Sequence, residues 1–317
     1  MGISRQVMVK AASLMCVITV AGILLACGED PVDPGDDQGW YLVYDNMLSW
    51  SPDGKEIAYQ NGGNSALGLR PGMYIVNLET LERRLVCPGL ICDTDWSPDG
   101  ERIVFSLYKS ICMIRPDGTD LQQLTSEHED IFAMYSPDGK TITFTRADEM
   151  LPGNTYMIPS VGGDVTKVTE FGHYADWFSD GERLSLRALD STNRLQIAIL
   201  HLADDSLEIL TTEAQRIWED IRFPLVSPSG KEIIFSSTER NAKRLSLYAV
   251  DVCADPPTVR KFMAVAYYGR YSPDEKYFAY TKPCEGKGAI YVRDLATGEE
   301  TRVSPGSGPD CENCPLK

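Results

Sequence analysis

The chain has 317 residues and a formal net charge of −16, with 46 acidic and 30 basic side chains. This acidic balance argues against nucleic-acid binding, which depends on a basic surface. It also gives no attraction to an anionic membrane surface, so membrane attachment is expected only through an N-terminal lipid.

Residues 1–26 have the pattern of a bacterial secretion signal. Arg5 and Lys10 form a basic start, an apolar run covers 11–25, and Ala26 precedes Cys27. The apolar run is too short for a membrane-spanning helix, which needs about 20 residues. The segment Leu24-Leu25-Ala26-Cys27 resembles a lipobox, which implies cleavage before Cys27 and its acylation. The alternative is an ordinary signal peptide cut nearby. Two or more acyl chains would anchor the protein stably.

Residues 27–39 combine the lipidated cysteine with a tether rich in Pro, Gly and Asp, in which Val32 is the one apolar residue after Gly28. Such a composition cannot bury a core, so we expect a disordered spacer. Gly28 stands where a signal for retention in the inner membrane would carry aspartate. The resemblance to this sorting pattern favours the outer membrane, at its periplasmic face or at the cell surface.

A ten-residue stretch, Trp50-Ser51-Pro52-Asp53-Gly54 followed by an alternating apolar strand, recurs along the chain. Its six copies begin at Trp50, Trp96, Tyr135, Phe178, Val226 and Tyr271. Proline presets the first central position of a type I turn, aspartate suits the second, and glycine accepts the left-handed position that follows. The motif therefore predicts a hairpin turn between two short strands, with the preceding aromatic packed between repeats.

The copies are spaced by about 44 residues, a period typical of four-stranded propeller blades. We therefore expect an all-β fold, a six-bladed β-propeller of four-stranded antiparallel blades, over residues 40–305. Residues 306–317 form a cysteine-containing tail. The repeated motif resembles that of the TolB-type, WD40-like propellers, which implies this fold but is weak for function, because one propeller hosts many activities.

Two features depart from the TolB pattern. Only the tether separates Cys27 from the first expected strands, where TolB carries an α/β domain. This puts in doubt any transfer of TolB's role in the Tol-Pal system. In addition, the run Tyr41-Leu42-Val43-Tyr44 could close the ring as a strand of the last blade, but Glu300 to Val303 already fills that place.

The chain contains nine cysteines, of which Cys16 lies in the leader and Cys27 at the anchor. In an oxidising compartment the other seven can pair. We expect a local disulfide between Cys87 and Cys92, a second between Cys253 and Cys284, and a third within Cys311-Glu312-Asn313-Cys314. Cys112 is expected to be buried and free. No second Cys-x-x-Cys completes a zinc site, so no metal is predicted.

A propeller binds ligands at the mouth of its central channel, near the starts of the first strands. The candidate residues for this channel mouth are Asp130, His173, Tyr174, Asp220, Arg222 and Tyr267. Histidines and carboxylates that converge there could hold a divalent cation or a sugar. The alternative is that they are ordinary solvated loop residues.

The sequence favours a monomeric, non-catalytic scaffold without a cofactor that binds an envelope protein or a glycan. A peptidase would need a hydrolase domain, and no Gly-x-Ser-x-Gly elbow is present. The enzymatic alternative is a metal-dependent lyase acting on acidic oligosaccharides. It would need histidine ligands at the channel, where only His128 and His173 are placed to contribute. A purely structural envelope component is the third possibility.

The sixth copy of the motif carries Glu275 where the others carry glycine. A left-handed backbone at a non-glycine residue is mildly strained. We therefore expect Glu275→Gly to raise the melting temperature in a thermal unfolding experiment. No change in the melting temperature, or a fall, would indicate that the backbone of Glu275 is not left-handed.

Overall fold

The structure, a computed structural model, describes residues 46–63, 68–147, 153–169, 172–192, 194–211, 221–238, 245–284 and 287–305. Across these residues the regular secondary structure is β-strand, and none of them forms a helix long and apolar enough to cross a membrane. The expected leader, tether, Tyr41–Tyr44 strand and Cys311–Cys314 pair lie outside the described residues and stay predictions.

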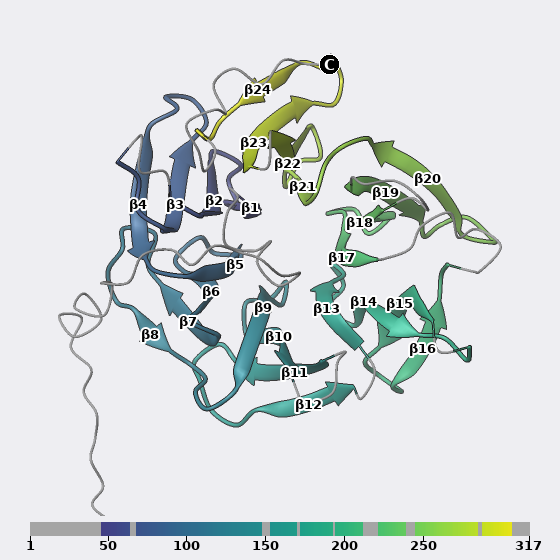
Figure 1. The fold of residues 1–317 in the computed structure, drawn as a ribbon. Coiled ribbons are helices and arrows are strands. Elements are labelled where there is room, and N and C mark those ends of the chain that lie inside the picture. The colour runs from purple at the N-terminus through teal and green to yellow at the C-terminus, as the bar shows by residue number, and fades with distance from the viewer. Residues whose placement is uncertain are drawn as a thin grey trace, which may run out of the picture. The chain divides into compact units, whose positions relative to one another are not determined.

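The strands form six separate four-stranded antiparallel sheets, each built from consecutive strands, as predicted. Figure 1 shows these blades arranged around a centre, with the first strand of each blade innermost. The first three blades comprise β1 (Asn46–Trp50), β2 (Glu56–Asn61), β3 (Gly72–Asn77) and β4 (Arg83–Pro88); β5 (Ile91–Trp96), β6 (Ile103–Leu107), β7 (Ser110–Ile114) and β8 (Gln122–Gln123); and β9 (Glu129–Tyr135), β10 (Thr141–Ala147), β11 (Asn154–Pro159) and β12 (Thr166–Thr169).

The last three blades repeat this order. They comprise β13 (Gly172–Trp177), β14 (Arg183–Leu189), β15 (Leu195–His201) and β16 (Ser206–Ile209); β17 (Arg222–Val226), β18 (Glu232–Thr238), β19 (Leu245–Asp251) and β20 (Thr258–Met263); and β21 (Gly269–Tyr271), β22 (Tyr277–Cys284), β23 (Lys287–Asp294) and β24 (Glu300–Arg302). The six-bladed, four-stranded prediction is confirmed.

The repeated turn is held by its own side chains. Ser51 Oγ donates to Asp53 Oδ1 at 2.7 Å, and the same oxygen of Asp53 accepts the Lys55 N–H at 3.1 Å. Ser51 Oγ also accepts the Glu56 N–H at 2.9 Å, which ties the turn to the start of β2. The hydrogen bond from Ser51 is the main reason that the pKa of the Asp53 carboxyl lies below its usual value.

The fourth turn is shifted by one residue from the position that its serine predicts. Phe178 N–H donates to the Arg183 carbonyl and Gly181 N–H donates to the Phe178 carbonyl, both at 3.0 Å. In the other turns, these backbone bonds belong to the serine. The sequence of this copy lacks the proline and predicts a shorter Asp-Gly turn, but the prediction is wrong: the turn keeps its length, Phe178 replaces the serine, and Ser179 replaces the proline. Phe178 is fully buried against the fifth blade.

Neighbouring turns touch through their proline and glycine. A Cβ added to Gly100 would lie 3.8 Å from Pro52 Cδ of the preceding turn, and one added to Gly139 would lie 3.5 Å from Pro98 Cδ. The turns of consecutive blades therefore pack side by side at one face of the propeller, so the motif stabilises contacts between blades as well as its own hairpin.

The fifth and sixth turns depart from the motif together. Ser229 replaces the aspartate of the fifth turn, and Glu275 replaces the glycine of the sixth. Glu275 has a φ of 56°, which confirms the left-handed position. Its carboxylate accepts the Ser229 N–H at 2.6 Å, so the two substitutions are joined by a hydrogen bond between the turns.

The core consists of interfaces between blades, filled by the second and third strands. Aromatic pairs recur at the same cross-strand position in the first, third, fifth and sixth blades, with ring centroids 5.6–6.1 Å apart. The pairs are Tyr59–Tyr74, Phe144–Tyr156, Phe235–Tyr248 and Tyr280–Tyr291. The motif aromatics, such as Trp50 and Trp96, are buried in the same interfaces, as predicted.

The ring closes by side-chain contact between the first and sixth blades, each of which is complete from its own four strands. Trp50 Nε1 donates to the Arg270 carbonyl at 3.2 Å. Thr281 Oγ1 lies 3.2 Å from Asn46 Oδ1 in a buried hydrogen bond. Within the described residues, closure therefore needs no strand shared between the first and the last blade.

The expected disulfides are not formed among the described thiols. Cys87, Cys92, Cys112 and Cys253 are all free. Cys87 points into the core between the first and second blades, whereas Cys92, next to Ile91 of that core, stays partly exposed, so the Cys87–Cys92 pairing was wrong. Cys253 is exposed and unpaired, which also contradicts its pairing with Cys284. Cys112 is buried and free, as predicted.

The bond between Glu275 and Ser229 changes the expected effect of Glu275→Gly. Relief of the left-handed strain is worth about 1 kcal/mol, and loss of the hydrogen bond costs a similar amount. The single variant should therefore melt near the wild type. Ser229→Asp keeps this backbone donor but places a second carboxylate beside that of Glu275, and the two repel each other. In that background Glu275→Gly removes the repulsion as well as the strain and should raise the free energy of unfolding by about 1–2 kcal/mol.

A double-mutant cycle by urea denaturation measures this coupling. Asp138→Ser in the third turn is the matched control for changes at the aspartate position. Additive effects of Ser229→Asp and Glu275→Gly would contradict the coupling.

Candidate functional site

The propeller axis carries a cluster of large side chains from the innermost strands. We call Met47, Phe132, Tyr174, Phe223 and Tyr268 the axial aromatic cluster. The Phe132 ring lies 4.3 Å from Tyr174 and 5.3 Å from Phe223, and Phe223 lies 5.5 Å from Tyr268, measured between centroids. Because they come from blades one, three, four, five and six, these side chains fill the centre.

The backbone turns these residues toward the axis. In the first, third, fourth and fifth blades the residue has a positive φ, as at Met47 (49°), Phe132 (58°), Tyr174 (59°) and Phe223 (53°). Each sits in a β-bulge, where the register of the first and second strands shifts. Bulges bend a strand and re-aim its side chains. The repeated bulge is therefore what delivers side chains to the axis.

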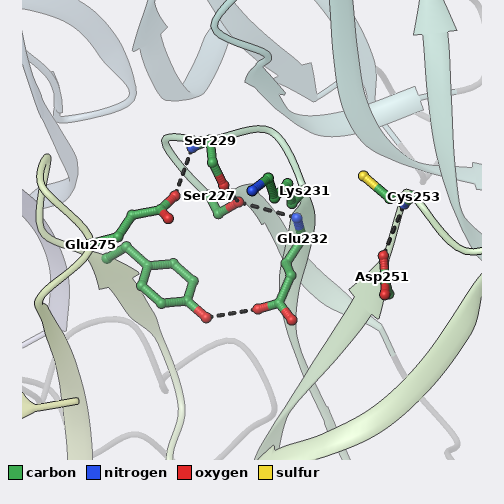
Figure 2. Close-up of a pocket in the computed structure, with 8 residues that line it drawn as sticks. Ser227, Ser229, Lys231, Glu232, Asp251, Cys253 and Glu275 are labelled. Carbon is green, nitrogen blue, oxygen red and sulfur yellow. Dashed lines mark hydrogen bonds between the residues drawn. The ribbon is translucent and has the colours of Figure 1, made fainter. Parts of the chain in front are cut away.

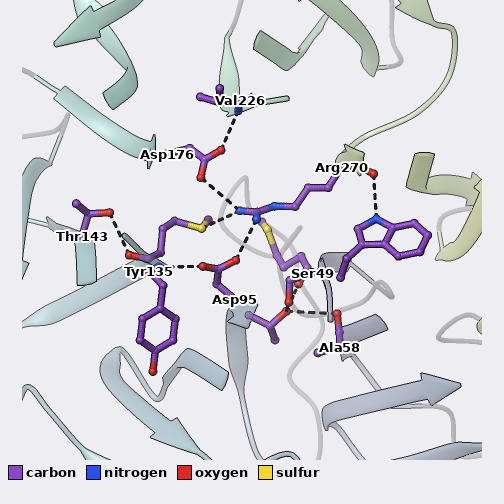
Figure 3. Close-up of polar contacts among 12 residues, drawn as sticks. Ser49, Ala58, Asp95, Tyr135, Thr143, Asp176, Val226 and Arg270 are labelled. Carbon is purple, nitrogen blue, oxygen red and sulfur yellow. Dashed lines mark hydrogen bonds and ion pairs between the residues drawn. The ribbon is translucent and has the colours of Figure 1, made fainter. Parts of the chain in front are cut away.

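A second layer at the axis is charged (Figure 3). Arg270 Nη1 lies 3.0 Å from Asp95 Oδ1, and Arg270 Nη2 lies 3.9 Å from Asp176 Oδ1. Arg270 Nε donates to the Tyr268 hydroxyl at 3.0 Å, which joins this layer to the axial aromatic cluster. We call Asp95, Asp176 and Arg270 the axial ion cluster. Their side chains are only 12–17% exposed.

The two aspartates also connect neighbouring blades. Asp95 Oδ2 accepts the Tyr135 N–H of the third blade at 2.9 Å. Asp176 Oδ2 accepts the Val226 N–H of the fifth blade at 2.8 Å. Burial raises the pKa of Asp95 to about 6, although Arg270 opposes this shift, and burial also raises the pKa of Asp176. The axial ion cluster is therefore an interior network that couples blades.

Two of the predicted channel-mouth residues are engaged in internal pairs. Asp130 is fully buried and receives Arg146 Nε at 2.7 Å and Nη2 at 2.9 Å. His173 is 4% exposed, and its Nε2 accepts a hydrogen bond from Arg187 Nε. Burial, and to a lesser extent the cation of Arg187, lower the pKa of His173 to about 3. His173 is therefore neutral and its Nε2 lone pair is occupied.

The other predicted channel-mouth residues lie in different environments. Tyr174 belongs to the axial aromatic cluster, and Tyr267 packs against the same core. Arg222 is partly buried at the start of β17. Asp220 lies outside the described residues. His128 is exposed. The structure thus brings Tyr174 to the axis, packs Tyr267 against the same core, and places Asp130 and His173 within blades three and four.

No set of metal ligands is assembled in the described part of the chain. Its His, Cys, Asp and Glu side chains form no group of three or more suited to a metal ion.

The sequence reasoning missed the axial ion cluster, although a signal was available. Asp95 and Arg270 lie two residues before the turn serines Ser97 and Ser272, and Asp176 lies two before Phe178. This position precedes each turn on the innermost strand. Alignment of the six repeats on the turn would have shown one basic and two acidic residues at one equivalent position.

The family model of the TolB beta propeller domain matches residues 46–257, more than half of the chain. The chain belongs to this family. The Tol-Pal system protein TolB of Alcanivorax borkumensis is 44% identical over 61 residues, which cover 19% of this chain and 13% of that protein. The matched segment thus spans a small part of that relative.

Solved structures agree on the fold of this TolB-type propeller. A TolB structure from Agrobacterium tumefaciens has a TM-score of 0.62 at 18% identity and covers 76% of this chain and 94% of its own. An oligogalacturonate lyase in complex with manganese has a TM-score of 0.55 at 12% identity, covering 83% of this chain and 77% of its own. At these identities the similarity shows the fold alone.

Removing the cation of the axial ion cluster should destabilise the propeller. Arg270→Met leaves two buried carboxylates without their counter-charge, which should cost about 3 kcal/mol of unfolding free energy at pH 7. Because the pKa of Asp95 is raised, its contribution to stability is full below the unfolded value of 3.8 and is lost as the pH rises through about 6. The penalty of Arg270→Met should therefore be smaller at pH 5 than at pH 7.

Urea denaturation at both pH values measures this difference. Adding Asp95→Asn and Asp176→Asn to Arg270→Met removes the unpaired charges and should restore part of the loss. A pH-independent penalty would contradict the charge argument.

Proposed function

We propose that the chain is an exported, lipid-anchored, non-catalytic propeller that binds a protein or glycan partner in the bacterial cell envelope. The observation that carries this proposal is the match of residues 46–257 to the TolB propeller domain. The leader and the segment Leu24–Cys27 support export and lipid attachment, and Gly28 supports the outer membrane. A monomer attached through its lipid fits the acidic charge of −16, which disfavours direct adsorption to anionic lipid.

The filled centre of the propeller favours binding at its faces. The axial aromatic cluster and the axial ion cluster fill the centre, and their polar atoms are used between blades. A partner would therefore contact the channel mouth or the rim formed by the turns. Tyr267, Arg222 and Asp220 are the channel-mouth residues that we propose for this contact.

The lyase alternative has less support from the site. It would use His128 and His173 as metal ligands, but Arg187 already donates to His173 Nε2. The similarity to oligogalacturonate lyase is one of fold, at 12% identity. Asp130, which could have served as a carboxylate ligand, is held by Arg146.

Crosslinking in intact envelopes tests the proposal. Cys27→Ala should move the protein from the membrane fraction to the soluble fraction. A variant with Asp220→Ala and Arg222→Ala should keep the membrane location and lose a specific crosslinked partner. Val161→Ala is a control, since Val161 is 89% exposed in the turn between β11 and β12. A wild-type chain with no specific crosslinked protein or glycan would contradict the proposal.

A further inference from the structure

A pocket of about 320 Å³ lies between the fifth and sixth blades at the face that carries the repeated turns. This volume falls at the lower end of the range for small-molecule sites, about 300–1,000 Å³. Figure 2 shows the fifth turn with Ser227 and Ser229 on one side, Glu275 on another, and Asp251 across the opening. We call this the inter-turn pocket.

The inter-turn pocket lies where two departures from the repeat meet. In the first turn the serine hydroxyl donates to an aspartate carboxylate at 2.7 Å, whereas Ser227 Oγ has Ser229 Oγ at 3.4 Å in that place. The shorter Ser229 side chain lines the pocket without supplying the carboxylate that an aspartate would place there. Glu275 occupies the position of a glycine and extends its side chain to the edge of this space.

The strain at Glu275 indicates that the departure has a use. A non-glycine residue at a φ of 56° is strained, and glycine would avoid this strain. Residues held in such conformations cluster at ligand sites and other functional positions. The hydrogen bond to Ser229 offsets the strain, and the second carboxylate oxygen remains available to a ligand.

The lining offers both donors and acceptors. The ammonium of Lys231 and the hydroxyl of Ser229 can donate. Asp251 and Glu275 each carry a carboxylate with about four acceptor positions, of which backbone N–H groups use one in each case. Glu232, the third carboxylate of the lining, differs, because it is held by Arg260 at 2.6 Å and by the Tyr271 hydroxyl at 2.8 Å.

This lining selects a class of ligand. An alkylammonium ion can only donate, so it would pair with the carboxylates but leave Lys231 and Ser229 without an acceptor. An anion can only accept and would face Asp251 and Glu275. A neutral molecule with several adjacent hydroxyls can donate to the carboxylates and accept from Lys231 and Ser229 together. We propose that the inter-turn pocket binds one ring of a neutral sugar, an inference that rests on the glycan branch of the proposed function.

Ligand-observed NMR with the purified chain tests the inference. The probes are galactose, glucose and N-acetylglucosamine, with galacturonate, glucosamine and glycylglycine as charged or zwitterionic comparisons. At least one neutral sugar should bind, and the charged probes should bind at least about tenfold more weakly, the equivalent of one lost hydrogen bond.

Two variants restore the repeat and should therefore fold. Ser229→Asp places a carboxylate in the lining of the pocket, and Glu275→Gly removes an acceptor. Each should weaken binding of the neutral sugar at least about tenfold, while thermal unfolding shows a native protein. Asp138→Ser makes the same kind of exchange in the third turn and should leave binding unchanged.

Three outcomes would overturn the inference: no neutral sugar binds, a charged probe or glycylglycine binds more tightly, or Ser229→Asp leaves binding intact. The proposed function fails by a different measurement. If crosslinking finds an envelope partner and no sugar binds, only the inter-turn pocket inference is lost. If a sugar binds and crosslinking finds no partner, the envelope proposal is lost.

Discussion

The contact between neighbouring blades is the constraint on which the rest of the structure depends. Each sheet buries apolar side chains on both faces, so a blade has no core of its own and needs a neighbour on each side. The first and last blades can satisfy this need only by meeting each other. They do so through side chains, with Trp50 against the Arg270 carbonyl and Thr281 against Asn46.

The same constraint explains the centre of the propeller. Six innermost strands converge on one axis, and the space between them must be filled. Bulges turn large side chains inward in one layer, and in the next a single arginine meets two aspartates. The aspartates bind backbone N–H groups of the following blades, so the charges also hold the ring together. The centre is thereby occupied by the protein's own side chains.

The turn face shows how a repeat can acquire a site. Where serine, proline, aspartate and glycine are all present, each turn is satisfied internally and packs on the turn before it. Between the fifth and sixth blades Ser229 and Glu275 break the pattern together and leave the inter-turn pocket. The fourth turn also breaks the pattern, but there Phe178 fills the space with a buried ring. The two departures therefore differ in their result: one buries an aromatic ring and the other lines a pocket.

The sequence by itself determined the blade count, the strand order and the turn chemistry, including the left-handed position of Glu275, because these depend on residues close together in the chain. It did not determine the bonding partners of Asp130, His173 or Cys87, which come from adjacent strands or neighbouring blades. Only the tertiary structure brought Asp95, Asp176 and Arg270 together and placed Glu275 on Ser229. The physical reason is that closure of the ring, rather than any local preference, sets the distances between repeats.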